Sequence, residues 1–138
     1  MKKKINYILL IDDDEVFNFL NEVVIRQVDC VENVVAVQSG EEGLKVLQEL
    51  KAEGATYPEL IFLDINMPVM NGWEFIDNYK QLEFGHHNHP VLIMLTSSEN
   101  PGDRARAAEV SVVNEYLNKP LTVETFQQIL ETNFSGRC

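Results

Sequence analysis

The sequence predicts an α/β protein, a doubly wound parallel sheet of five strands with five helices packed on its two faces. Five short apolar runs alternate along the chain with five longer segments whose apolar residues recur at helical spacing. The apolar runs are continuous, as expected for strands buried on both faces. Most of them end at or beside polar side chains, and sheets of this class bind ligands at the carboxyl ends of their strands.

The first strand is predicted over residues 8–11, an apolar run that leads directly into aspartates. Residues 15–28 then predict a helix with a wide apolar stripe that faces the core, counted at about 100° per residue. Phe19 and Ile25 lie more than a quarter turn from this stripe, so we expect them at the surface. The stripe itself consists of Val16, Phe17, Leu20, Val23, Val24 and Val28.

Residues 34–37 are mostly β-branched and predict the second strand. Ser39 and Gly40 open the helix that follows, and Gly54 ends it. The apolar residues at helical spacing in this segment are Leu44, Leu47 and Leu50.

Residues 60–63 predict the third strand, which ends in Asp64. A loop containing Pro68 leads from there into the third helix. Trp73 lies off the apolar face of this helix, so we expect it to be half exposed beside the strand ends. The apolar face is formed by Phe75, Ile76, Tyr79 and Leu82.

The fourth strand is predicted over residues 91–95 and is followed by Thr96. Asn100 and Pro101 begin the fourth helix, because proline suits a first helical turn. Residues 112–117 predict the fifth strand. Thr122 then caps a last helix, whose inward positions are Val123, Phe126, Ile129 and Leu130.

Length and composition restrict the function. The 138 residues fit a single domain, 1–138, with no room for a separate effector domain. The net charge of −11 disfavours direct nucleic-acid binding, because that affinity comes mostly from lysine and arginine. No apolar run is long enough for a membrane span or suited to a signal peptide. We therefore expect a cytoplasmic protein that acts through other proteins.

The ends of the predicted strands carry the candidate site. Residues 12–14 are aspartates, Asp64 follows the third strand, Thr96 the fourth and Lys119 the fifth. Grouped carboxylates repel one another unless a cation lies among them, and Mg²⁺ prefers carboxylate and phosphate oxygens. With Mg²⁺ and Lys119 nearby, the Asp64 carboxylate can attack a phosphoryl group and form an aspartyl phosphate.

In sequence order, these segments resemble the receiver domains of bacterial response regulators. The resemblance covers the strings Ile-Asp-Asp-Asp at residues 11–14, Leu-Asp-Ile-Asn-Met-Pro at 63–68 with Gly72 following, Leu-Thr-Ser at 95–97, and Tyr-Leu-Asn-Lys-Pro at 116–120. It implies a flavodoxin-like fold with strand order 2-1-3-4-5. It also implies that a sensor histidine kinase or a phosphotransfer protein phosphorylates Asp64.

The resemblance further assigns roles around Asp64. Asp12 and Asp13 would hold Mg²⁺ together with Asp64 and the backbone carbonyl of Asn66. Lys119 would contact the phosphoryl oxygens.

Two residues would form the switch that the resemblance implies. Thr96 would move toward the phosphoryl group and Tyr116 would rotate after it, which would reshape the surface of the fourth helix, fifth strand and fifth helix, about residues 100–133. Asn66 and Ser98 would tune how fast the aspartyl phosphate hydrolyses. A downstream protein partner, or a second copy in a homodimer, would read the altered surface.

Other interpretations of the same residues remain open. A haloacid-dehalogenase-like phosphohydrolase also uses an aspartate after a parallel strand, but it needs a second aspartate where this chain has Asn66. A receiver-fold scaffold that is never phosphorylated would not need the complete set of acid, hydroxyl and lysine. A nucleotide-binding module would require a glycine-rich loop after the first strand. We expect a switch that promotes its own phosphorylation and dephosphorylation and is not an enzyme on other substrates.

Smaller features have simpler readings. The aspartates at 12–14 also suit the start of a helix, and a tyrosine such as Tyr116 can merely pack. Phe19, near the acidic strand ends, is a candidate contact for a phosphodonor. His86, His87 and His89 crowd one loop with no cysteine nearby, so we expect exposed residues and no metal site there.

Overall fold

The computed structural model describes residues 3–82 and 90–137. The histidine-containing loop that includes His86, His87 and His89 lies outside these residues. The described chain contains a parallel sheet with strand order β2-β1-β3-β4-β5, which confirms the predicted topology. Its strands are β1 (Ile5–Ile11), β2 (Val31–Val37), β3 (Leu60–Leu63), β4 (Val91–Thr96) and β5 (Glu115–Asn118).

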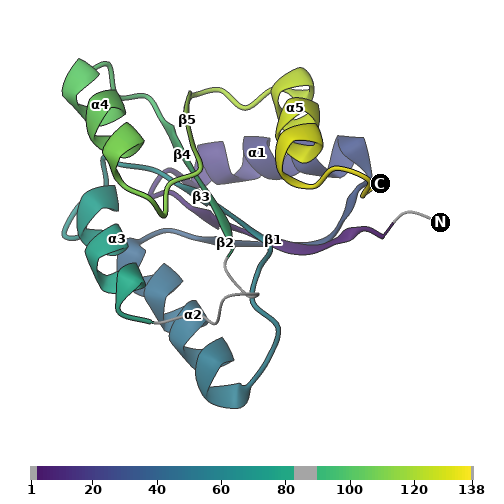
Figure 1. Ribbon diagram of the computed structural model, residues 1–138, viewed down its shortest axis with the longest axis horizontal. Helices are drawn as coiled ribbons and strands as arrows, with labels where there is room; N and C mark the ends of the chain where they lie inside the picture. Colours follow the sequence, from purple (N-terminus) through teal and green to yellow (C-terminus); the bar gives the residue numbers. More distant parts are fainter. Residues whose placement is uncertain (1–2, 83–89, 138) are drawn as a thin grey trace.

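Helices cover both faces of the sheet (Figure 1). On one face lie α1 (Glu15–Val28) and α5 (Val123–Asn133), packed over a cluster that includes Ile25 and Phe126. On the other face, α2 (Gly40–Glu53), α3 (Gly72–Lys80) and α4 (Pro101–Glu109) pack over a cluster that includes Phe75 and Ala107. Every residue of β3 is buried, as expected for a strand covered on both sides.

Each helix begins where a polar side chain accepts a hydrogen bond from a backbone amide of the first turn. Asn71 forms a complete capping box with Glu74, which fixes the start of α3 directly after the β3 loop. The predicted helix starts at Ser39 and Asn100 and the predicted cap at Thr122 are confirmed, and Asp14 caps α1. These caps follow β1, β2, β4 and β5 within a few residues, whereas a longer loop, residues 64–71, connects β3 to α3 at the carboxyl edge of the sheet.

The predicted orientation of α1 is correct only in part, since Val24 and Val28 pack against the core cluster as expected. Val16, Leu20 and Val23 were expected in the core, but their residues are 63%, 49% and 39% exposed. Ile25, expected at the surface, is fully buried, and the buried face of α1 is completed by two asparagines, Asn18 and Asn21. Phe19 is 67% exposed, which confirms its predicted place at the surface.

Asn18 explains the rotation of the helix. Its amide nitrogen donates to the backbone oxygens of Asp12, at 3.0 Å, and Val37, at 3.2 Å, at the ends of two neighbouring strands. The Val37 oxygen also accepts from the Asp12 amide at 3.2 Å, but the Asp12 oxygen at this buried strand end needs a donor, so a polar residue of α1 faces inward there.

The predicted fifth strand is placed too early. Val112 and Val113 belong to a turn in which the Val113 amide donates to the Val110 oxygen, and β5 starts at Glu115. The chain needs this turn to reverse direction after α4. The two β-branched valines favoured a strand in the prediction, although they lie in the turn. Among the described residues, no helix has the length and apolar character needed to cross a bilayer.

Candidate functional site

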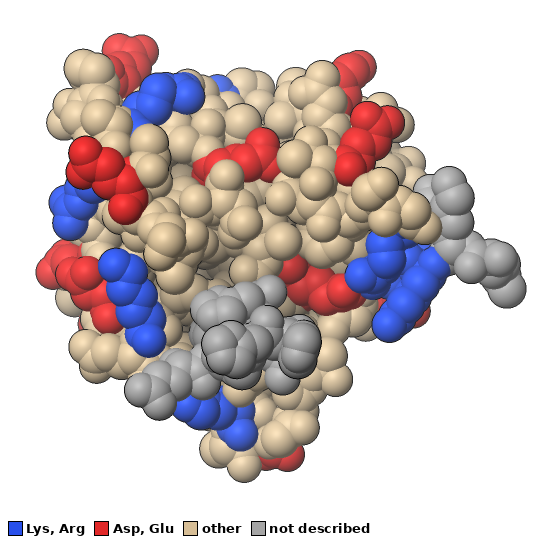
Figure 2. Space-filling model, in the orientation of Figure 1, with Lys and Arg blue, Asp and Glu red and all other residues tan. Residues whose placement is uncertain are grey.

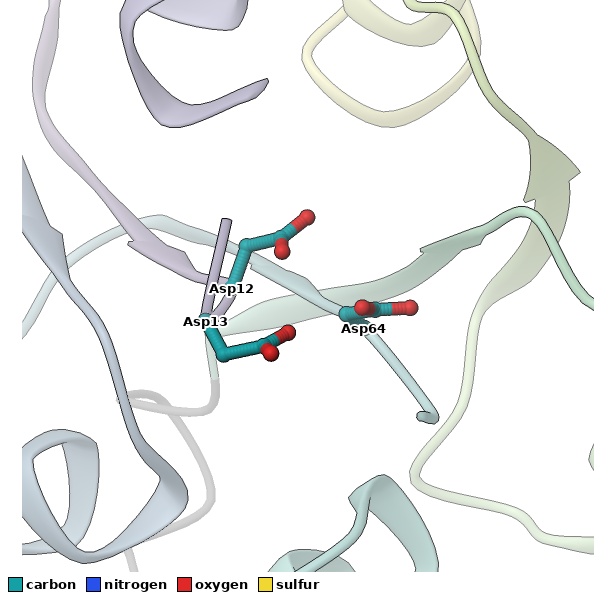
Figure 3. Close-up of side chains that lie close together, drawn as sticks. All are labelled: Asp12, Asp13 and Asp64. Carbon is teal, nitrogen blue, oxygen red and sulfur yellow. The ribbon is translucent and has the colours of Figure 1, made fainter. Parts of the chain in front are cut away.

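Three carboxylates meet at the carboxyl edge of the sheet. Asp12 and Asp13 follow β1 and Asp64 follows β3, and the paired register of Ile11 with Leu63 brings these ends together. One carboxylate oxygen from each residue lies within 4.8 Å of the other two. Figure 3 shows the three side chains projecting from their strand ends toward a shared space. Asp12 and Asp64 are buried and Asp13 is exposed, so the group opens to solvent on one side.

Lys119 places a cation among these acids, in addition to the Mg²⁺ that the sequence predicted there. Its Nζ lies 2.6 Å from Oδ2 of Asp12 and 3.4 Å from Oδ2 of Asp64. The lysine side chain is 5% exposed, and its ammonium group lies 4.1 Å from the centre of the Phe17 ring. A cation held over an aromatic face is stabilised by the ring's negative face. Phe17 therefore helps to place Lys119, a role that the sequence did not predict.

Backbone amides orient two of the carboxylates. The Asp14 amide donates to Oδ1 of Asp12 at 2.9 Å, and the Ile65 amide donates to Oδ1 of Asp64 at 2.8 Å. The other oxygen of each carboxylate is the one nearest Lys119. These hydrogen bonds leave Oδ2 of Asp64 pointing toward the cation rather than toward the backbone.

Burial raises the pKa of Asp12 above its usual value. Hydrogen bonds from Lys119 and from the Asp14 amide lower the pKa in part, while the charge of Asp64 raises it further. A group whose ionised form is penalised by burial and by a like charge is stabilised by a nearby cation. The donor set of carboxylate oxygens therefore fits a hard divalent ion such as Mg²⁺.

Gly72 allows the loop after β3 to close tightly. A Cβ atom at this position would lie 2.6 Å from the backbone oxygen of Asp64 and 2.9 Å from Cα of Ile65. The Gly72 amide also donates to the Ile65 oxygen at 2.8 Å. Any larger residue would push α3 away from the site, which accounts for the glycine in this segment. Asn66 is exposed in the same loop.

Thr96 ends β4 and is fully buried. Its hydroxyl accepts a hydrogen bond from the Ser98 amide at 3.1 Å, and its backbone oxygen accepts one from the Lys119 amide at 2.9 Å. Thr96 is thus tied both to the loop that follows it and to the residue that neutralises the acids.

Tyr116 packs against the cluster on the α3 and α4 side of the sheet. Its hydroxyl is buried and has no hydrogen-bond partner within residues 3–82 and 90–137. The Arg104 guanidinium lies 4.7 Å from the ring centre and donates to Oδ1 of Asn118 at 2.9 Å. The ring therefore points inward with a cation above it.

Trp73 does not occupy the predicted half-exposed position. It is 6% exposed, its ring is covered by the Arg106 guanidinium at 4.5 Å, and its indole nitrogen donates to Oδ1 of Asp103 at 3.2 Å. Helical spacing alone does not show that side chains of α4 cover Trp73. Asp103 itself was missed, since an acid in a first helical turn has an ordinary explanation.

Comparisons with known proteins agree with this fold. Residues 8–131 match the model of the response regulator receiver domain. The chain is 40% identical to a two component response regulator from Cytophaga hutchinsonii, with a TM-score of 0.87 over 96% of this chain and 98% of that one. It is 26% identical to the Mn²⁺-bound form of response regulator Rcp1, with a TM-score of 0.70 over 94% of each chain.

A curated relative places the same unit inside a longer protein. The chain is 31% identical over 105 residues to a probable cyclic di-GMP phosphodiesterase from Vibrio cholerae, which is 75% of this chain and 22% of that protein. The fold is that of a two-component signalling domain. The chain belongs to the response regulator receiver domain family.

Proposed function

We propose that this receiver accepts a phosphoryl group on Asp64 from a sensor histidine kinase or a phosphotransfer protein and passes the signal to a protein partner. One observation carries the proposal: Asp64 is a buried carboxylate with an ammonium group 3.4 Å from Oδ2 and two further carboxylates within 4.8 Å. The histidine kinases that serve as donors draw on ATP, so we place the protein in the cytoplasm.

Asp12, Asp13 and Asp64, with the backbone carbonyl of Asn66, are the residues that would hold Mg²⁺. The Mn²⁺-bound form of the similar protein Rcp1 supports a divalent ion in this family. When bound, the ion neutralises charge on the phosphoryl oxygens.

The residues around Asp64 account for the transfer step. Oδ2 of Asp64 attacks the phosphorus atom of the donor's phosphohistidine, and the phosphorus–nitrogen bond breaks as the new phosphorus–oxygen bond forms. The donor imidazole keeps the electron pair of the broken bond. Lys119 then gives up part of its contact with Asp64 and contacts the oxygens of the transferred phosphoryl group. Its ammonium group neutralises the negative charge on these oxygens during the transfer. The protein promotes this reaction on itself and is not an enzyme on other substrates.

The exposed face of α1 is a docking surface for the phosphodonor. Apolar residues at positions i, i+3, i+4 and i+7 form a continuous exposed stripe on a helix that starts directly after the acidic residues. A helical partner can bury this stripe while it presents its phosphohistidine to Asp64. The stripe consists of Val16, Phe19, Leu20 and Val23.

Phosphorylation is read out through Thr96 and Tyr116. The Thr96 hydroxyl moves toward the phosphoryl group, and Tyr116 responds by repacking, which alters the surface of α4, β5 and α5 for a downstream protein or a second copy of the chain. Asn66 and Ser98, two positions beyond Asp64 and Thr96, tune the rate of hydrolysis. The −11 net charge and the mixed charges on the face in Figure 2 favour a protein partner over nucleic acid.

Intact mass spectrometry with a small phosphodonor tests the proposal. Wild-type protein incubated with acetyl phosphate and Mg²⁺ should gain the mass of one phosphoryl group, and Asp64→Asn should gain none. Asp77→Asn, which changes an exposed acid of α3, is the matched control and should react like wild type. An adduct that persists in Asp64→Asn, or none in wild type, contradicts the proposal.

A further inference from the structure

Asp103 connects three parts of the molecule next to the site. It lies in the first turn of α4 and is half-buried. One of its carboxylate oxygens, Oδ1, accepts from the Trp73 indole nitrogen at 3.2 Å, and the other, Oδ2, accepts from the Ser98 hydroxyl at 2.6 Å. A single carboxylate therefore joins the start of α3, the loop between β4 and α4, and α4 itself.

The contact with Ser98 reaches Thr96. The Ser98 amide donates to the Thr96 hydroxyl at 3.1 Å, and the Ser98 hydroxyl also accepts from the Asn100 amide at 3.3 Å. The hydroxyl that has to approach a phosphoryl group on Asp64 is thus engaged with the loop that Asp103 holds. Buried Trp73 fixes Asp103 on its other side.

A simple helix-start role does not account for these contacts. An acid in a first turn is favourable even when it is exposed to solvent, as Glu41 is in α2. Asp103 instead uses both oxygens for side chains from other elements, and hydrogen bonds to a charged acceptor are stronger than neutral ones.

We propose that Asp103 is a positioning residue that holds the β4–α4 loop in its unphosphorylated arrangement, so that Thr96 reaches the phosphoryl group only when the Ser98 contact is released. This inference rests on the proposed function. A contact made in one state only shifts the equilibrium toward that state. Loss of the Asp103 carboxylate should therefore favour the phosphorylated state.

Affinity for beryllofluoride, a phosphoryl mimic, measures that equilibrium. By titration calorimetry with saturating Mg²⁺, Asp103→Ala should bind beryllofluoride roughly ten- to a hundredfold more tightly than wild type, the range expected from one hydrogen bond to a charged group. Ser98→Ala should show a similar gain. The double variant should gain no more than either single variant, because both changes remove the same contact.

Three comparisons separate this inference from structural damage and from the proposed function. Glu41→Ala, which removes an exposed acid from the first turn of α2, should leave the affinity unchanged, and thermal unfolding reports stability separately for each variant. If Asp103→Ala does not fold, Asp103→Asn keeps the size with one acceptor and should show an intermediate gain. Unchanged or weaker binding, or additive effects in the double variant, overturns the inference alone. Wild-type protein that binds no beryllofluoride overturns both the inference and the proposed function.

Discussion

Val69 adopts a backbone conformation that its side chain disfavours. Its φ is 67°, in the left-handed region where a β-branched residue is strained. The residue is 88% exposed, so packing does little to offset this strain. We predict that Val69→Asn raises the free energy of unfolding by about 1 kcal/mol, because asparagine tolerates this region without glycine's entropy cost. Urea denaturation measures the change. Gly54 has nearly the same φ, 66°, with open space around it, so Gly54→Ala should lower stability. A loss of stability in Val69→Asn contradicts the prediction.

The buried hydroxyl of Tyr116 also lowers the stability of the fold. Its hydroxyl is buried without a partner among residues 3–82 and 90–137, and an unpaired buried hydroxyl costs about 1–3 kcal/mol. We predict that Tyr116→Phe does not destabilise the unphosphorylated protein and stabilises it by up to about 1 kcal/mol. A chemical denaturation curve for each protein tests this. A clear loss of stability would mean that the hydroxyl is hydrogen-bonded in the unphosphorylated protein.

Helix α1 illustrates at the element scale what a sequence can and cannot predict. Its bounds follow from its cap and its helical spacing, and they match the structure at both ends. Its inward face does not follow, because the helix has apolar residues on several sides and the choice is made by Asn18, whose partners are carbonyls at the ends of two strands. The need of buried strand-end carbonyls for hydrogen-bond donors therefore determines the inward face more than the number of apolar side chains does. Trp73 was misplaced for a related reason, since its cover comes from α4.

Asn18 should therefore matter more than the exposed apolar residues of its own helix. We predict that Asn18→Ala lowers the free energy of unfolding by about 2 kcal/mol, because the buried Asp12 carbonyl loses its donor and the Val37 carbonyl loses one of its two hydrogen bonds. Leu20→Ala, at a position that is 49% exposed, should cost less than about 1 kcal/mol. Equilibrium unfolding of the two variants decides between the faces. A larger loss of stability in Leu20→Ala than in Asn18→Ala would indicate that the apolar stripe faces the core.

At the scale of the whole molecule, topology made the site predictable. Parallel strands place all their carboxyl ends at one edge, so Asp12, Asp64 and Lys119 had to converge although they are far apart in the sequence. Contacts between neighbouring helices depend instead on side-chain packing, and the spacing of residues in the sequence does not predict them. This is why the carboxylates and the lysine were predicted, whereas the link through Asp103 was not.

The end of the chain is fastened to the sheet by a paired contact far from the site. Arg137 Nη1 lies 2.7 Å from Oε1 of Glu59 and its Nη2 lies 2.8 Å from Oε2, while the same guanidinium donates to the backbone oxygens of Lys3 and Lys4. Burial raises the pKa of Glu59, but hydrogen bonds from Arg137 and from the Asn6 amide outweigh it and hold the pKa below its usual value of 4.5. The ionised carboxylate is therefore stabilised by folding.

A lowered pKa in the folded state has a defined pH signature. The stability that Glu59 contributes is present above its unfolded pKa and is lost as the pH falls through the lower folded pKa. We predict that Glu59→Gln lowers the free energy of unfolding by about 1 kcal/mol at pH 7, and that the difference from wild type shrinks once the pH falls well below 4.5. Urea denaturation at several pH values measures this. Glu22→Gln, which breaks the exposed pair with Arg26, should change little at any pH. A Glu59→Gln loss that stays constant down to low pH would show that the carboxylate charge does not stabilise the fold.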